Sequence, residues 1–234
     1  MLNRRTIIVL TCACLLAMGC GSDKKRVTRR LPDAPEISRP EPPPPVVAND
    51  RRPAIYIETG MASWYGPPYH NRKAANGEIY DMHAMTAAHK TLPLGSIVRV
   101  TNIATGHSAI VRINDRGPFI GTRIIDLSLA AAKATDVWRA GVAKVRVEVL
   151  EAPQPIDRGG RWCVQIGAFS DQDEATRLKL KLARRYSTAK VIQFTGPTGE
   201  WVRFRAANDD KSKAVEVARN THVNEGGVFL VRLD

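Results

Sequence analysis

Short runs of valine, isoleucine and aromatic residues, separated by turns, dominate the middle of this chain. The clearest of them are residues 60–66 (GMASWYG), 96–102 (SIVRVTN), 108–114 (SAIVRIN) and 143–150 (AKVRVEVL). Turn signals such as Leu94-Gly95 and Gly117-Pro118 separate these runs, as expected of β-strands. Residues 127–135 (LSLAAAKAT) form one helical candidate, with Ser128 as its cap. Many short strands with one small helix favour a compact β-barrel over alternating strand and helix units.

Two polar segments divide the chain. Residues 21–54 include RRLPDAPEISRPEPPPPVVANDRRP, which is dense in proline and charge and has no hydrophobic period. Such a segment buries too little apolar surface to fold, and its proline run is extended and semi-stiff. We therefore expect a leader over residues 1–19, a tether over 20–55, a barrel domain over 56–151, a linker over 152–158 and a second domain over 159–234.

The first twenty residues have the pattern of an export signal. Two arginines precede an apolar run, residues 6–18, that is shorter than the ~20 residues a membrane span needs. The ending LAMGC resembles the lipobox of bacterial lipoproteins, which implies acylation of Cys20 with palmitate. Gly21 is not the aspartate that retains similar proteins in the inner membrane, so the resemblance implies an outer-membrane lipoprotein facing the periplasm. The alternative is an ordinary cleaved signal that ends at a cysteine by chance.

Charge and cysteine content exclude several classes of protein. The 234-residue chain has a formal net charge of +12, with a basic excess of +5 in residues 1–55, +3 in 56–151 and +4 in 152–234. A charge spread this evenly disfavours a nucleic-acid partner and favours an anionic envelope surface. Only Cys163 remains after export and acylation, so we expect no internal disulfide. No His/Cys cluster has metal-ligand spacing, and we expect neither a metal nor another cofactor.

Four long segments of the barrel region carry a family resemblance. They are GMASWYG, AANGEIYDMHAMTAAHKTLPLGSIVRVTN, VRINDRGPF and RIIDLSLAAA. In this order and at this spacing, they closely resemble the double-psi β-barrel domain of the rare lipoprotein A family. The resemblance implies a lytic transglycosylase, a lyase that cleaves peptidoglycan strands lacking stem peptides. It also matches the family's functional acid, histidine and aspartate positions to Glu78, His89 and Asp115.

The residue types agree with that chemistry. Cleaving a glycosidic bond requires a group that protonates the leaving oxygen and a group that stabilises the oxocarbenium-like centre. Glu78, Asp115 and Asp126 offer carboxylates, and an imidazole titrates near neutral pH. Asp115 also has a structural alternative, which is to satisfy turn amides or to pair with Arg116. Asp126 precedes the predicted helix, whose amides would keep its pKa low.

From these patterns we predict a role for each side chain. Asp115 and Glu78 are expected to be catalytic, with His89 assisting. Asp126 is expected mainly to support the fold, and we also count it among the substrate-binding candidates. The other binding candidates in the barrel are Trp64, Tyr65 and Arg116. The two aromatic residues could stack on sugar rings or fill the barrel core, and the sequence leaves both alternatives open.

The C-terminal segment has a different pattern. Strand-like runs at residues 162–169, 190–194, 200–207 and 228–234 alternate with amphipathic helical patterns at 170–186 and 209–220. This order predicts a small ferredoxin-like domain, in which both helices cover one face of a four-stranded antiparallel sheet. The predicted fold class is therefore mainly β plus α+β, with a barrel followed by a βαββαβ domain.

Residues 164–169 read VQIGAF, and this motif resembles the SPOR domain, whose family binds peptide-free glycan at division septa. Strand alternation turns Gln165 and Phe169 away from the helices, and it does the same for Trp201, Arg203 and Arg205. Such an open face is suited to a sugar polymer that bears lactyl carboxylates. An RNA-recognition sheet has the same topology, but its paired aromatic motifs are absent and the export signal argues against it.

Together these patterns predict a lipoprotein that cuts peptide-free peptidoglycan strands during septal wall processing and daughter-cell separation. The expected partners are the glycan strands, the outer membrane through the lipid on Cys20, and septal division proteins. The alternative from another class is a non-catalytic peptidoglycan-binding scaffold at the division site. A third alternative is an inverting hydrolase, which needs two carboxyl groups roughly 6.5–9.5 Å apart with a water between them.

Overall fold

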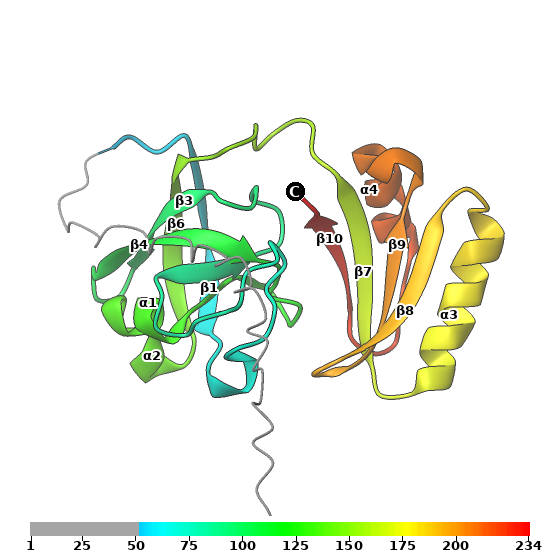
Figure 1. Cartoon of the computed structure of the whole chain (residues 1–234), viewed down its shortest axis with the longest axis horizontal. Coiled ribbons are helices and arrows are strands. Elements are labelled where there is room, and N and C mark those ends of the chain that lie inside the picture. Colours follow the sequence, from blue (N-terminus) through cyan, green and yellow to red (C-terminus); the bar gives the residue numbers. More distant parts are fainter. Residues whose placement is uncertain (1–51) are drawn as a thin grey trace, which may run out of the picture. The chain divides into compact units, whose positions relative to one another are not determined.

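The computed structural model describes residues 52–234, and these contain a barrel domain followed by a smaller C-terminal domain (Figure 1). Cys20 and the predicted signal and tether up to residue 51 lie outside the described residues. The barrel domain comprises β1 (Tyr56–Trp64), η1 (Pro67–Tyr69), β2 (Thr86–His89), β3 (Ile97–Asn102), β4 (Ser108–Asp115), β5 (Arg123–Leu127), α1 (Leu129–Ala134), α2 (Val137–Ala140) and β6 (Ala143–Glu151). The C-terminal domain comprises β7 (Trp162–Phe169), α3 (Gln172–Arg185), β8 (Lys190–Gly196), β9 (Gly199–Arg205), η2 (Ala207–Asp209), α4 (Lys211–Asn220) and β10 (Gly227–Arg232).

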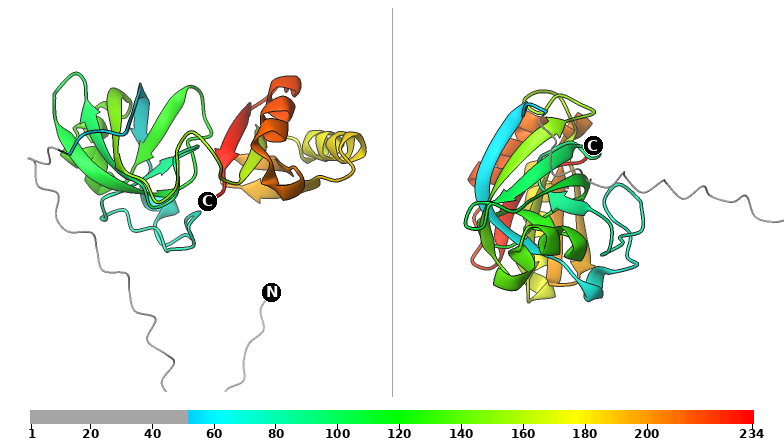
Figure 2. Two further views of the ribbon diagram at one scale, coloured as in Figure 1. Left: turned by 90° about the horizontal axis from the view of Figure 1, so that it is seen from above. Right: turned by 90° about the vertical axis from the view of Figure 1, so that its left-hand side faces the viewer.

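The six strands of the first domain form a closed barrel in the order β1-β5-β2-β4-β3-β6. Two pairs, β1 with β5 and β2 with β4, are parallel, and the remaining pairs are antiparallel. Alternate residues of β3 and β4 point inward, among them Val98, Val100, Val111 and Ile113. Each fully buried aliphatic side chain of this kind contributes about 1.5–3 kcal/mol. The barrel prediction is confirmed, and Figure 2 shows its strands in cyan to green.

A short helical segment follows β5. Ser128 is the N-cap of α1, as predicted, because its hydroxyl oxygen accepts a hydrogen bond from the Ala131 amide at 3.1 Å. The same hydroxyl donates to the carbonyl of Ala84 at 2.7 Å, which ties the start of the helix to the segment before β2. A second short helix, α2, was not predicted from the sequence.

The C-terminal domain is an antiparallel sheet in the order β10-β7-β9-β8. Both helices contribute to a single hydrophobic core with the sheet, so they cover the same face, as predicted. The buried members of that core include Ala175 and Leu182 from α3, Ala214 and Val217 from α4, and Val164, Ile166, Val202 and Phe204 from the sheet. The predicted α+β domain is therefore confirmed.

One predicted side-chain direction in this sheet is wrong. The register of β7 against β9 shifts between Gly167 and Phe169, which breaks the alternation of inward and outward residues. Gly167 has φ +136°, and a Cβ at this position would lie 2.7 Å from the carbonyl oxygen of Glu200. The shift places the ring of Phe169 in the helix-side core, where it is 1% exposed. Phe169 is therefore a packing residue in the structure rather than part of an open face.

Candidate active site

A cavity of about 650 Å³ opens at one side of the barrel. Its barrel side is lined by Trp64, Tyr65, Asp115, Arg116, Arg123 and Asp126. Five of the seven catalytic or binding positions predicted in the barrel therefore line it, whereas Glu78 and His89 do not. A volume of this size lies within the range of about 300–1,000 Å³ that is typical of ligand sites.

Asp115 is the last residue of β4, and its carboxylate faces this cavity. Its Oδ1 accepts hydrogen bonds from the backbone amides of Ala75 (2.9 Å) and Arg116 (2.8 Å). Burial raises the pKa of the Asp115 carboxyl, and the two amides only partly oppose that effect. Asp115 thus both accepts hydrogen bonds from backbone amides, as its structural alternative predicts, and lines the cavity. A raised pKa is also what a proton donor needs near neutral pH.

Asp126 lies in β5 and also lines the cavity. Its carboxylate accepts hydrogen bonds from the Ser63 hydroxyl (2.7 Å) and from the Arg123 guanidinium (3.2 Å). Burial raises its pKa, so the low pKa that we expected from a following helix is wrong. The reason is that Ser128, two residues later, occupies the cap position and leaves Asp126 within the strand.

The two acids lie on either side of a small residue. Ala88 in β2 is the register partner of Asp115 on β4 and of Asp126 on β5. Neighbouring strands are about 4.8 Å apart, so the backbones that carry the two carboxylates are separated by roughly 10 Å. Only the methyl group of Ala88 lies between them in the sheet, which leaves room for a substrate atom to approach both acids.

Glu78 lies on a loop beside the cavity. Its carboxylate accepts two hydrogen bonds from the Arg112 guanidinium, at 3.0 and 2.8 Å. This bidentate ion pair lowers the pKa of Glu78, so the group is ionised near neutral pH. The same loop reaches the end of β4 through the Ala75 amide on Asp115 and the Asn76 amide on the Asn114 carbonyl. The position and charge of Glu78 therefore suit a residue that orders the loop around Asp115 rather than a proton donor.

His89 is buried, with 2% of its surface exposed. Its Nδ1 accepts hydrogen bonds from the amides of Thr91 (3.2 Å) and Leu92 (3.1 Å), and its Nε2 lies 3.3 Å from a carboxylate oxygen of Glu58. Burial lowers the pKa of His89, which favours the neutral ring. The ring thus fixes a tight turn and does not face the cavity. Its partner, Glu58, was not predicted from the sequence, although a single acid in an otherwise uncharged strand was the available signal.

The turn that His89 fixes is connected to Asp115 by a short path. Arg116 donates from its guanidinium to the carbonyls of His89 (3.0 Å) and Leu92 (2.7 Å). Its backbone amide binds the Asp115 carboxylate, as described above. His89 therefore positions the turn, the turn positions Arg116, and Arg116 positions the acid. The expected pairing of the Arg116 side chain with Asp115 is replaced by these carbonyl contacts.

Aromatic side chains border the cavity on the barrel side. Tyr65 stacks on Tyr80 with ring centroids 4.2 Å apart, and the Tyr80 hydroxyl donates to the carbonyl of Tyr65 at 2.7 Å. Trp64 is half-buried and packs partly against the barrel core. Both alternatives for these residues therefore apply, because each ring packs against the protein and still lines the cavity.

The C-terminal domain contributes Gln165, Phe194, Trp201 and Arg203 to the same cavity. The Arg203 guanidinium donates to Gln165 Oε1 at 2.7 Å and lies 5.1 Å from the centre of the Phe194 ring. Gln165 and Trp201 are only 3% and 4% exposed, so the expectation of an open sheet face is wrong for both. Arg205 is held away from the cavity by two hydrogen bonds of 2.7 Å to Asp209.

Two further findings bear on function. No group of three or more His, Cys, Asp or Glu side chains within residues 52–234 is arranged to hold a metal ion. No helix among the described residues is long and apolar enough to cross a membrane.

A closed barrel with two half-buried acids at its cavity is followed by a small α/β domain, and this is the architecture of a double-psi β-barrel protein with a SPOR domain. The family model described as "Lytic transglycolase" matches residues 57–147, and the SPOR domain model matches residues 159–232. With these two matches and the relatives described next, the chain is similar to proteins of the rare lipoprotein A (RlpA) family.

Two similar curated proteins have the same name. The endolytic peptidoglycan transglycosylase RlpA of Vibrio cholerae is 55% identical over 172 residues, which is 70% of this chain and 65% of that protein. The protein of the same name from Helicobacter pylori (strain J99) is 44% identical over 151 residues, covering 53% of this chain and 48% of its own length. This chain thus spans less than two thirds of either relative. Among solved structures, a mutant expansin of Clavibacter michiganensis aligns over 63% of this chain and 78% of its own, at 15% identity and TM-score 0.35.

Proposed function

We propose that this protein is a lytic transglycosylase that cleaves peptide-free peptidoglycan strands and leaves 1,6-anhydromuramic ends. The observation that carries this proposal is the pair of acids, Asp115 and Asp126, which line one cavity and whose pKa values are both raised by burial. A raised pKa is the direction of shift that a carboxyl group needs in order to donate a proton nearer neutral pH. The names of the matched relatives and of the barrel family support the same reaction.

The surroundings of the two acids assign them different roles. The Ser63 hydroxyl and the Arg123 guanidinium both favour the ionised form of Asp126. Asp115 has only backbone amides on its carboxylate, because the Arg116 side chain is directed to the carbonyls of the 89–92 turn. Asp115 is therefore the better proton donor, and Asp126 is the better carboxylate to stabilise positive charge.

The reaction needs no external nucleophile. Asp115 donates its proton to the glycosidic oxygen, and the bond from that oxygen to C1 of the muramic sugar breaks with its electron pair going to the oxygen. Asp126 stabilises the positive charge that develops at C1. The 6-hydroxyl of the same sugar then attacks C1, and its proton passes to Asp115, which restores the acid. The products are a free 4-hydroxyl and an anhydro ring, and no water is consumed.

A second candidate function is a non-catalytic peptidoglycan-binding scaffold. It is favoured by the position of Glu78, which is held ionised by Arg112 and does not line the cavity. The experiment that separates the two is incubation of the purified chain with peptide-free strands, followed by mass spectrometry. Anhydro-ended sugars support the transglycosylase, reducing ends identify a hydrolase, and no products identify a scaffold.

We place this activity at the cell envelope. The signal-like N-terminus and the lipobox resemblance support a lipid on Cys20, an outer-membrane anchor and a periplasmic orientation. The SPOR match supports enrichment at the division septum, near other division proteins.

A further inference from the structure

The cavity at the acids is lined by both domains, and this arrangement has a functional consequence. We propose that the barrel and the SPOR sheet form one composite binding site, so that a single peptide-free glycan segment contacts Arg203 of the sheet and Phe119 of the barrel while it lies at Asp115. This inference rests on the proposed function for its substrate class. It adds that recognition by the SPOR sheet and cleavage by the barrel take place on the same stretch of strand.

Phe119 forms the contact between the two sides of this site. It follows Asp115 by four residues, in the loop between β4 and β5. Its ring lies 5.6 Å from the ring of Trp201 and 5.6 Å from that of Phe229, in edge-on geometry with both. The loop that follows the acid therefore also packs on aromatic residues of the sheet, and its Phe119 lines the cavity.

Arg203 supplies a positive charge that the protein does not neutralise. In the part of the chain that the structure describes, it makes no ion pair with an acidic side chain, and its buried Nε has no hydrogen-bond partner. Other arginines nearby are paired, since Arg205 binds Asp209 and Arg123 binds Asp126. A half-buried guanidinium without a counter-ion at a cavity wall is suited to an anionic ligand.

The chemistry of a peptide-free strand fits these groups. Each muramic sugar carries a lactyl group, which ends in a free carboxylate when the stem peptide is absent and in an uncharged amide when the peptide is attached. Arg203 can form charge-assisted hydrogen bonds with the free carboxylate only. The half-buried ring of Phe119 offers apolar surface to the sugar rings. The composite site would therefore distinguish peptide-free from peptide-bearing strands at the place where the bond is cut.

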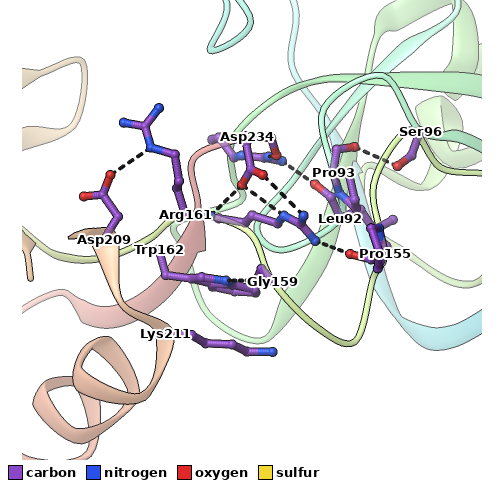
Figure 3. A network of polar contacts seen from close by, with 12 residues as sticks. Leu92, Pro93, Ser96, Pro155, Gly159, Arg161, Trp162, Asp209, Lys211 and Asp234 are labelled. Atoms are coloured by element: carbon purple, nitrogen blue, oxygen red, sulfur yellow. Dashed lines mark hydrogen bonds and ion pairs between the residues drawn. The ribbon is translucent and has the colours of Figure 1, made fainter.

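A network of polar contacts connects the barrel and the C-terminal domain (Figure 3). Arg232 in β10 is fully buried, and its guanidinium donates to the Pro155 carbonyl at 2.7 Å while its backbone amide donates to the Lys90 carbonyl at 3.0 Å. The Arg116 guanidinium donates to the backbone oxygen of Asp234 at 2.7 Å. The arginine next to the acid thus also binds the end of β10, so the sheet and the acid are positioned by the same contacts.

The test is a binding measurement without turnover. Asp115→Asn in the full chain serves as the parent protein, and calorimetry measures binding of a peptide-free tetrasaccharide of alternating N-acetylglucosamine and N-acetylmuramic acid. We expect one tetrasaccharide per chain. Phe119→Ala and Arg203→Gln should each weaken binding about tenfold, equivalent to about 1.4 kcal/mol. Arg203→Lys should recover part of the loss, and Arg177→Gln, an exposed arginine on α3, should leave the affinity unchanged.

A second ligand isolates the role of charge. Chitotetraose has the same backbone without lactyl carboxylates. The parent should therefore bind it more weakly than the muramic tetrasaccharide, whereas Arg203→Gln should bind both ligands with the same affinity. Thermal unfolding of each variant verifies that it is folded. Two tetrasaccharides per chain, an unchanged affinity in Phe119→Ala, or no binding at all would overturn the composite site. The proposed function is tested separately, by anhydro products from the wild-type chain, so either idea can fail without the other.

Discussion

His89→Ala should destabilise the protein strongly, although an exposed catalytic histidine could be removed at little cost. The substitution leaves the amides of Thr91 and Leu92 without their acceptor, in a site where the ring is 2% exposed. A buried polar group that loses its partner costs about 1–3 kcal/mol, and the lost ring leaves a void. We therefore expect a loss of about 3–5 kcal/mol, a large share of the roughly 5–15 kcal/mol typical of a domain.

The assays are urea unfolding for the free energy and thermal unfolding for the melting temperature, with parallel measurement of anhydro products. A loss of 3–5 kcal/mol corresponds to a fall in melting temperature of about 6–20 °C for a chain of this size. Activity should fall as well, because the turn at residues 89–92 holds Arg116 beside Asp115. His83→Ala is the matched control, since His83 is an exposed histidine of the same domain. A His89→Ala protein with unchanged stability and no activity would refute this reasoning and indicate direct participation in the chemistry.

The same residue predicts a dependence of stability on pH. Burial lowers the pKa of His89 in the folded state, so the unfolded chain takes up a proton at this position more readily than the folded chain does. The contribution of His89 is therefore fully present above the ordinary pKa of about 6.5 and is lost as the pH falls toward the lowered value. Wild-type stability should decrease between pH 7 and pH 5, and His89→Gln should show a smaller decrease over that range. Equal slopes for the two proteins would count against a buried neutral ring.

The remaining predictions concern the acids and the anchor. Asp115→Asn should lower the rate of anhydro-product formation by about 10²–10⁴-fold in a folded protein, measured by mass spectrometry; near-normal product formation would remove Asp115 as the proton donor. Asp126→Asn should also be inactive yet folded, because the cap of α1 is Ser128, and loss of the fold would restore the purely structural role expected from the sequence. Glu78→Gln should retain measurable activity with a less ordered loop, detected as faster proteolysis near residues 73–80, because its two bonds to Arg112 lose their charge. Cys20→Ala should lose palmitate labelling and be depleted from membranes, and retained label would show that the lipobox assignment is wrong.

The barrel and the α/β domain were predictable because their signals are local. Alternation in β3 and β4, turns at glycine and proline, and the cap at Ser128 all depend on residues within a few positions of one another. By contrast, β2 is four residues long and buried throughout, so it has no alternation to detect. The bulge at Gly167 is set by the neighbouring strand, and for that reason the outward direction of Phe169 was wrongly predicted.

The site was only partly predictable, because its properties depend on contacts between distant segments. The position of Asp115 between a strand and a glycine turn followed from the sequence, but its raised pKa comes from burial, and one of its two amide partners, Ala75, lies 40 positions away. The ion pair of Glu78 with Arg112 joins residues 34 positions apart, and no spacing rule indicates it. The covering of Gln165 and Trp201 arises from packing of a second domain, which no strand pattern within that domain contains.

Arg116 has a consequence for how the molecule melts. Its contacts reach the β4 acid, the turn after β2 and Asp234 just after β10, so the two domains cannot separate without breaking the hydrogen bonds of this half-buried guanidinium. The barrel and the sheet should therefore lose their structure in one cooperative calorimetric transition, although each has its own hydrophobic core. Substitutions near the C-terminal end of β10 would then change the enthalpy of that single unfolding transition. They would also change how long Asp115 stays in its position at the cavity.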